Sequence, residues 1–222
     1  MSRREGVVAA LGLAGAALCG GVAQTFLWRW GADSLAAVLG SQFTWVLLTF
    51  AVSWAAARGR VGTGVAAGAL TGLALIVSYY ATQWLADGRH AALSQFTGTG
   101  GTAWTLAAVG GGAAMGVFGA LAGRDAEQSP RLKALGISTP AVIVGAGAPL
   151  WLLYFEGSLG AARLLPAVVV FVAAGAALLL AAVRSCGLGP SLQGLVVSLG
   201  FAAAALGALM FLQTQGWLYL TF

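Results

Sequence analysis

The sequence predicts an all-α, polytopic membrane protein, a single transmembrane helical bundle of about seven spans formed by residues 1–222. Of the 222 residues, only 8% are charged and 59% are hydrophobic, whereas a soluble domain carries about 25% charged residues. Apolar stretches of about 20 residues, the length that crosses a hydrocarbon core, recur along the chain. Because the backbone must satisfy its own hydrogen bonds in lipid, we expect these stretches to be helices.

The spans are delimited in order by basic, glycine-rich or charged segments. The first follows Arg3 and Arg4, and cleavage of this segment as a secretion signal after Ala23 is the alternative to a retained helix. The second is short and is joined to the third by the tight 58–60 turn. The fourth follows a glycine-rich run, and the fifth follows the charged loop 123–137. The predicted spans are 7–27, 41–57, 61–86, 102–122, 138–157, 165–184 and 191–215.

The basic residues predict the orientation, because cytoplasmic loops are enriched in lysine and arginine. One set of segments contains Arg3, Arg4, Arg58, Arg60, Arg124, Arg131, Lys133 and Arg184, and the other contains Arg29, Arg89 and Arg163. This uneven division predicts a cytoplasmic N-terminus and, with seven spans, an external C-terminus. We therefore expect a multi-pass protein of the bacterial cytoplasmic membrane.

The composition also limits the partners and cofactors. The formal charge is +5, but the basic residues lie between apolar segments, where orientation and anionic lipid headgroups account for them, so no nucleic-acid partner is expected. The loop 123–137 is too small for a nucleotide-binding domain, so an ATP-driven activity would need a separate ATPase. The single histidine, His90, and the two cysteines lack metal-ligand spacing, and we expect no metal and no cofactor.

Glycine is abundant, with 34 copies, and recurs at four-residue spacing in several spans. Small residues at this spacing let membrane helices approach closely. Packing within the chain explains the spacing, and a docking face for another membrane subunit is the alternative. The preferred candidate for such a face is the first span, with Gly12, Ala16 and Gly20.

Aromatic and polar side chains gather in the half of the bundle predicted to be outer. Seven of the eight tryptophans belong to this half, and only Trp54 is inner. Small residues inside and large ones outside predict a pocket that opens outward, with a one-sided aromatic belt as the alternative. Polar groups in membrane helices often mark such sites. The candidate ligand-binding residues are Tyr79, Tyr80, Gln83, Trp104, Trp151, Tyr154 and Glu156, and Glu156 is alternatively a solvated residue at a helix end.

No motif for catalysis is found. The chain lacks the HExxH, G-x-S-x-G and paired-aspartate patterns of familiar enzymes. An enzyme is therefore not expected, and no catalytic residue is assigned.

Trp45 in the short second span, the Tyr79-Tyr80 pair, the glycine-rich stretch 111–123 and Glu156 carry a resemblance. Over about 40–160, the chain resembles a family of small, functionally uncharacterised integral membrane proteins most familiar from actinobacteria, which implies no activity. A more distant similarity is to the substrate-capture subunits of energy-coupling-factor transporters, which implies an outward-facing pocket and a partner subunit.

Three functions follow as hypotheses. The first is a transport component: an outward-facing small-molecule binding or permease subunit without its own energy source. The second is a non-catalytic accessory or assembly subunit of a larger membrane complex. The third is an intramembrane or lipid-modifying enzyme. The expected partners are the lipid bilayer, another membrane subunit with or without an ATPase, and a small-molecule ligand.

Overall fold

A computed structural model describes residues 3–27, 33–87, 99–159 and 161–214, and the described part of the chain is helical throughout its regular structure. The order of elements is α1 Arg3–Ala16, η1 Ala17–Leu27, α2 Asp33–Leu39, α3 Gln42–Ala57, α4 Val61–Asp87, α6 Thr99–Ala122, α7 Pro130–Leu159, α8 Ala161–Cys186 and α9 Leu188–Thr214. The predicted all-α class is therefore confirmed for these residues.

Four described helices are long and apolar enough to cross a membrane: Val61–Asp87, Trp104–Ala122, Pro130–Leu150 and Leu165–Cys186. Shorter apolar helical stretches cover Ala10–Ala23, Gln42–Ala57 and Leu188–Ala204. The long apolar helices identify a helical membrane protein.

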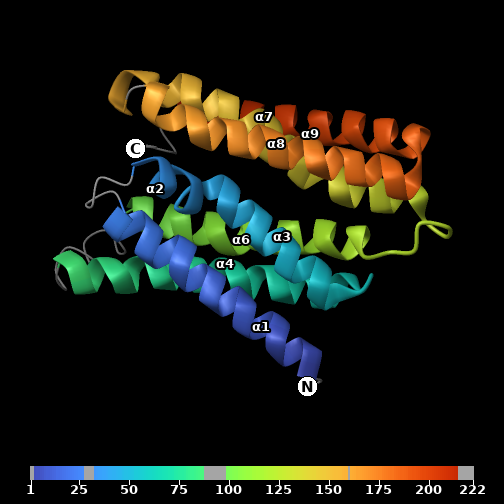
Figure 1. Ribbon diagram of the computed structural model, residues 1–222, viewed down its shortest axis with the longest axis horizontal. Coiled ribbons are helices and arrows are strands. Elements are labelled where there is room, and N and C mark those ends of the chain that lie inside the picture. The colour runs from blue at the N-terminus through green and yellow to red at the C-terminus, as the bar shows by residue number, and fades with distance from the viewer. Residues whose placement is uncertain (1–2, 28–32, 88–98, 160, 215–222) are drawn as a thin grey trace.

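The helices form two groups that pack along α3, α6 and α7 (Figure 1). The first group contains α1, η1, α3, α4 and α6, and the second contains α7, α8 and α9. From α3 onward, successive long helices run in alternating directions, so the segments that end α3, α6 and α8 lie at one end of the bundle (Figure 1). These segments contain Arg58, Arg60, Arg124, Arg131, Lys133 and Arg184. We call this end of the bundle the basic end.

Glycine determines the closest helix contact, between antiparallel α4 and α6. A Cβ added to Gly64 or Gly68 would overlap the backbone oxygen of Gly116 or Gly112, so only glycine allows the two backbones to lie this close. The same register pairs Gly72 with Ala108. These residues are the four-residue pattern of the sequence, and they act by packing two helices within the chain.

Apolar clusters join the two groups of helices. Phe43 of α3 lies against Phe171 of α8, with ring centroids 5.4 Å apart, in a cluster that includes Ala37, Val144 and Ala148. A second cluster joins Phe50 of α3 to residues of α6, α7 and α8, namely Ala122, Ile137 and Ala182. In the second group, the hydroxyls of Thr139 and Ser198 lie 3.0 Å apart and link α7 to α9.

One connection is shorter than the sequence predicts, and another contains a short helix. The predicted loop 123–137 is shorter, because α7 begins at Pro130, where proline suits the first turn of a helix. Arg131 and Lys133 are therefore helical, whereas Arg124 remains in the connection. The segment before the second span contains the short helix α2, which packs on α8 and is separated from α3 by the N-cap Ser41.

Candidate functional site

A cavity of about 300 Å³ lies among α3, α4, α6 and α7. It begins level with the Gly68–Gly112 contact and extends mainly away from the basic end, toward Gln42 of α3 and Trp104 of α6. Its wall is largely apolar and includes Trp45, Trp104 and Gln42. The distribution of small and large residues predicts a pocket in this region that opens outward.

Register explains how the cavity forms. Thr49 of α3 and Gly72 of α4 both line the cavity, and Gly111 of α6 leaves open space, because nothing lies within 4 Å of a Cβ built on it. Trp45 and Trp104 are the largest side chains in the lining. The lining thus combines indoles of α3 and α6 with glycines of α4 and α6.

Trp45, which lines the cavity, carries a buried polar group without a hydrogen bond in the part of the chain that the structure describes. Its indole N–H is buried without a partner among the described residues. A buried donor without an acceptor costs about 1–3 kcal/mol. The hydroxyl of Thr49, in contrast, donates to the backbone carbonyl of Trp45 at 2.7 Å.

The predicted ligand-binding residues separate into three sets. Trp104 lines the cavity. Tyr79, Tyr80 and Gln83 lie further along α4, about one to two turns beyond Leu75, and they do not line this cavity. The side chains of Trp151, Tyr154 and Glu156 lie outside the described residues, so the structure does not place them.

The tyrosine cluster is organised within its own helix. The amide nitrogen of Gln83 donates to the hydroxyl oxygen of Tyr79 at 2.7 Å, and the rings of Tyr79 and Tyr80 meet edge to face at 5.1 Å. Two threonines of the same helix, Thr71 and Thr82, donate to backbone carbonyls four residues earlier. The polar groups of α4 are therefore largely satisfied locally and need no water-filled pocket.

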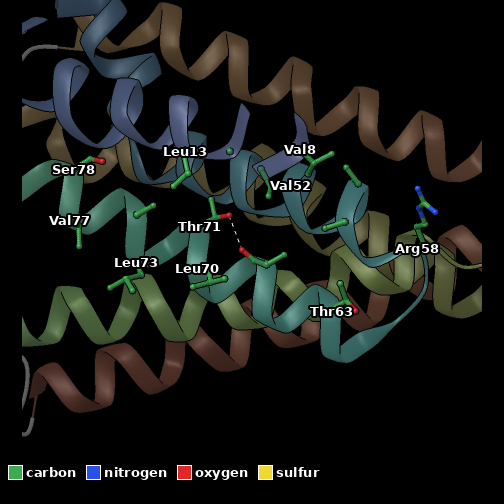
Figure 2. Close-up of a pocket in the computed structure, with 15 residues that line it drawn as sticks. Val8, Leu13, Val52, Arg58, Thr63, Leu70, Thr71, Leu73, Val77 and Ser78 are labelled. Carbon is green, nitrogen blue, oxygen red and sulfur yellow. Dashed lines mark hydrogen bonds between the residues drawn. The ribbon is translucent and has the colours of Figure 1, made fainter. Parts of the chain in front are cut away.

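A second, larger hollow of about 640 Å³ runs between α1, α3 and α4, and it is almost entirely apolar (Figure 2). Its lining includes Gly12, Val52 and Thr71, with Arg58 at one end. The spacing of residues in the sequence does not predict this hollow. A signal was present in the alanines that face it, Ala55 and Ala56 of α3 with Ala67 and Ala74 of α4.

The small-residue stripe of the first helix packs within the chain. A Cβ on Gly12 would lie 3.2 Å from the side chain of Val52, Ala16 is fully buried, and Gly20 lies against the backbone carbonyl of Leu75. The structure thus accounts for this spacing by internal packing, which was the alternative to a docking face for a partner subunit.

Among the described residues, no group of three or more histidine, cysteine or acidic residues is placed to hold a metal ion. No protein-family model matches the sequence, and neither a curated protein nor a solved structure matches it. The chemistry of the cavity therefore rests on its lining alone, which is suited to binding a molecule and supplies no described nucleophile paired with a base.

Proposed function

We propose that the chain is a transport component of the membrane: an outward-facing subunit that binds a small molecule and has no energy source of its own. The observation that carries this proposal is the 300 Å³ cavity among α3, α4, α6 and α7, walled by two tryptophans and backed by glycine. Ligand sites between helices of a bundle have volumes of about 300–1,000 Å³, with mostly apolar walls and a few polar groups.

The proposed topology has seven spans, with the N-terminus in the cytoplasm. Its support is the set of four long and three shorter apolar helical stretches, together with the basic residues that share one end of the bundle. Since cytoplasmic segments are enriched in lysine and arginine, the basic end is assigned to the cytoplasm. The cavity then lies in the outer half of the bacterial cytoplasmic membrane.

The lining indicates the class of ligand. No charged side chain is among the residues that line the cavity, and Gln42 and Trp45 contribute amide and indole groups. A small volume with aromatic walls favours a compact, uncharged and largely apolar molecule. The unpaired indole N–H of Trp45 favours a molecule with a hydrogen-bond acceptor, because an acceptor would remove the cost of a buried unsatisfied donor.

Two neighbouring glycines provide a matched test. Gly111 lines the cavity, Gly110 does not, and a Cβ on either one meets nothing within 4 Å. Gly111→Leu should therefore fill the cavity without disturbing the backbone, while Gly110→Leu adds the same side chain outside it. The measurement is mass spectrometry of the small molecules that co-purify with each protein in mild detergent.

Wild type and Gly110→Leu are expected to retain the same small molecule, and Gly111→Leu is expected to lose at least most of it. Equal retention by Gly111→Leu, or no retained molecule in any of the three, would show that the cavity is not the binding site. Proteins that co-purify in the same samples distinguish the two functions. An ATPase or permease would supply the energy source for transport, whereas other membrane subunits alone would indicate the accessory role.

A further inference from the structure

The large hollow between α1, α3 and α4 is a groove with one charged end. Arg58 and Thr63 lie at this end, and Ser78 lies at the other (Figure 2). Between them the lining is aliphatic, and several of its large side chains are exposed, among them Leu70 at 65% and Val77 at 55%. Exposed aliphatic side chains along a membrane helix face lipid, so the groove opens sideways into the bilayer.

The groove arises from the way that the first helix leans on its neighbours. The continuous helical segment formed by α1 and η1 comes close to α4 in η1, where Gly20 lies against the backbone of Leu75. Nearer the N-terminus, Gly12 and Gly15 meet the branched side chains of Val52 and Leu48 on α3 instead. These side chains prevent close backbone contact, and α1 lies at an angle to the other long helices (Figure 1).

The length of the groove fits one lipid chain. Along α4 it extends from Thr63 to Ser78, fifteen residues later. At 1.5 Å per residue this distance is about 22 Å, and one leaflet supplies about half of a hydrocarbon core ≈30 Å thick. A single acyl chain that enters at the membrane surface beside Arg58 can therefore lie in the groove over the full depth of a leaflet.

Arg58 supplies the charge that such a lipid requires. Its side chain is exposed and forms no ion pair with the side chains that the structure describes. The residue ends α3 in the left-handed region, with φ 45° and ψ 45°. Helix ends with this conformation usually have glycine there, because a side chain is disfavoured.

We propose that the groove binds one anionic glycerophospholipid, with an acyl chain between α1, α3 and α4 and the phosphate against Arg58. Arg58 and Arg60 both lie at the basic end, and basic residues beside a membrane surface attract anionic headgroups. The site is separate from the cavity of the proposed function, and it requires only that these helices lie in a membrane.

The charge is tested with two arginines two residues apart. Arg58→Asn removes the guanidinium and keeps a residue that tolerates the left-handed conformation, and Arg60→Asn removes the same charge outside the groove. The full chain in a non-ionic detergent is titrated with palmitoyl-oleoyl phosphatidylglycerol, or with the phosphatidylcholine of the same chains. Native mass spectrometry then counts the lipids bound to each protein.

The groove itself is tested with two adjacent alanines of α4. Ala67 lines the groove, whereas Ala66 is exposed and does not. Ala67→Leu fills the groove and Ala66→Leu is the matched control. Ala56→Leu on α3 is a second filling variant, in case the first does not fold. Thermal unfolding of every variant checks that the bundle is intact.

The wild type should bind one phosphatidylglycerol in preference to phosphatidylcholine. Arg58→Asn should weaken phosphatidylglycerol binding about five-fold, the change expected for one basic residue near an anionic surface, and Arg60→Asn should retain most of it. The groove-filling variants should lose both lipids. Equal losses in the two arginine variants, unchanged binding in the filling variants, or a stable dimer that excludes lipid would overturn the proposal.

Discussion

The contact between α4 and α6 makes the strongest prediction about stability. A Cβ on Gly68 would overlap the carbonyl oxygen of Gly112 and lie 3.0 Å from the Cα of Gly116. These are backbone atoms and cannot rotate away, so Gly68→Ala must push the two helices apart. In lipid, helices associate mainly through close van der Waals packing, and their separation loses that packing directly.

The magnitude follows from two effects of opposite sign. Forcing an extra methyl group into a packed contact costs about 1–3 kcal/mol. Replacing glycine by alanine in a helix interior otherwise gains about 1 kcal/mol. Gly110→Ala on α6 provides the control, because a Cβ there meets nothing within 4 Å. Since both variants share the helix gain, they should differ in unfolding free energy by the packing cost alone, about 1–3 kcal/mol, with Gly68→Ala the less stable.

The assay is reversible unfolding of the protein in mild detergent by increasing sodium dodecyl sulfate, followed by the helical circular dichroism signal. Gly68→Ala should unfold at a lower detergent fraction than wild type, and Gly110→Ala at the same or a higher one. If Gly68→Ala is as stable as Gly110→Ala, then the backbones of α4 and α6 are not in contact and the packing described above is wrong.

Two further outcomes are expected. In a double-mutant cycle of Thr139→Val and Ser198→Ala, the buried hydroxyl pair between α7 and α9 should show a coupling of about 0.5–1 kcal/mol; additivity of the two changes would mean that the hydroxyls do not interact. A membrane-impermeant maleimide should label Cys186, which lies at the basic end, in inverted vesicles and not in intact cells. Buried Cys19 should stay unlabelled in both. Labelling of Cys186 in intact cells would reverse the proposed orientation.

Long apolar runs made the helices predictable, because length and hydropathy alone decide whether a segment suits the bilayer. Their ends were less predictable where polar residues are helical. Arg131 and Lys133 read as loop residues, yet they belong to α7, whose first residue is Pro130. The change from α1 to the wider η1 at Ala17 has no signal in hydropathy, because the same apolar residues suit either helix.

The candidate site was predictable in part, and the reason lies in how polar groups are satisfied. The size of Trp104 and its position beyond the glycine contact predict that it lies in a pocket, and it lines the cavity. The polarity of Tyr79 and Gln83 predicts a ligand-binding role, but the two side chains form a hydrogen bond with each other on one helix face. Sequence shows that a group is polar and does not show what satisfies it. The groove was missed because its lining is made of ordinary aliphatic residues.

The small residues of α4 show why spacing alone did not separate contact from cavity. Gly64 and Gly68 face glycines of α6 at the same height, so the backbones meet. Another face of the same helix, with Ala67 and Ala74, is equally small, but the helix opposite is held away by Val52 and Leu48 of α3, and a groove results. A small residue thus produces a close contact only where its partner is also small at that depth. Whether two membrane helices pack closely or leave a groove depends on how their residues align with each other. The periodicity of one helix alone does not predict that alignment.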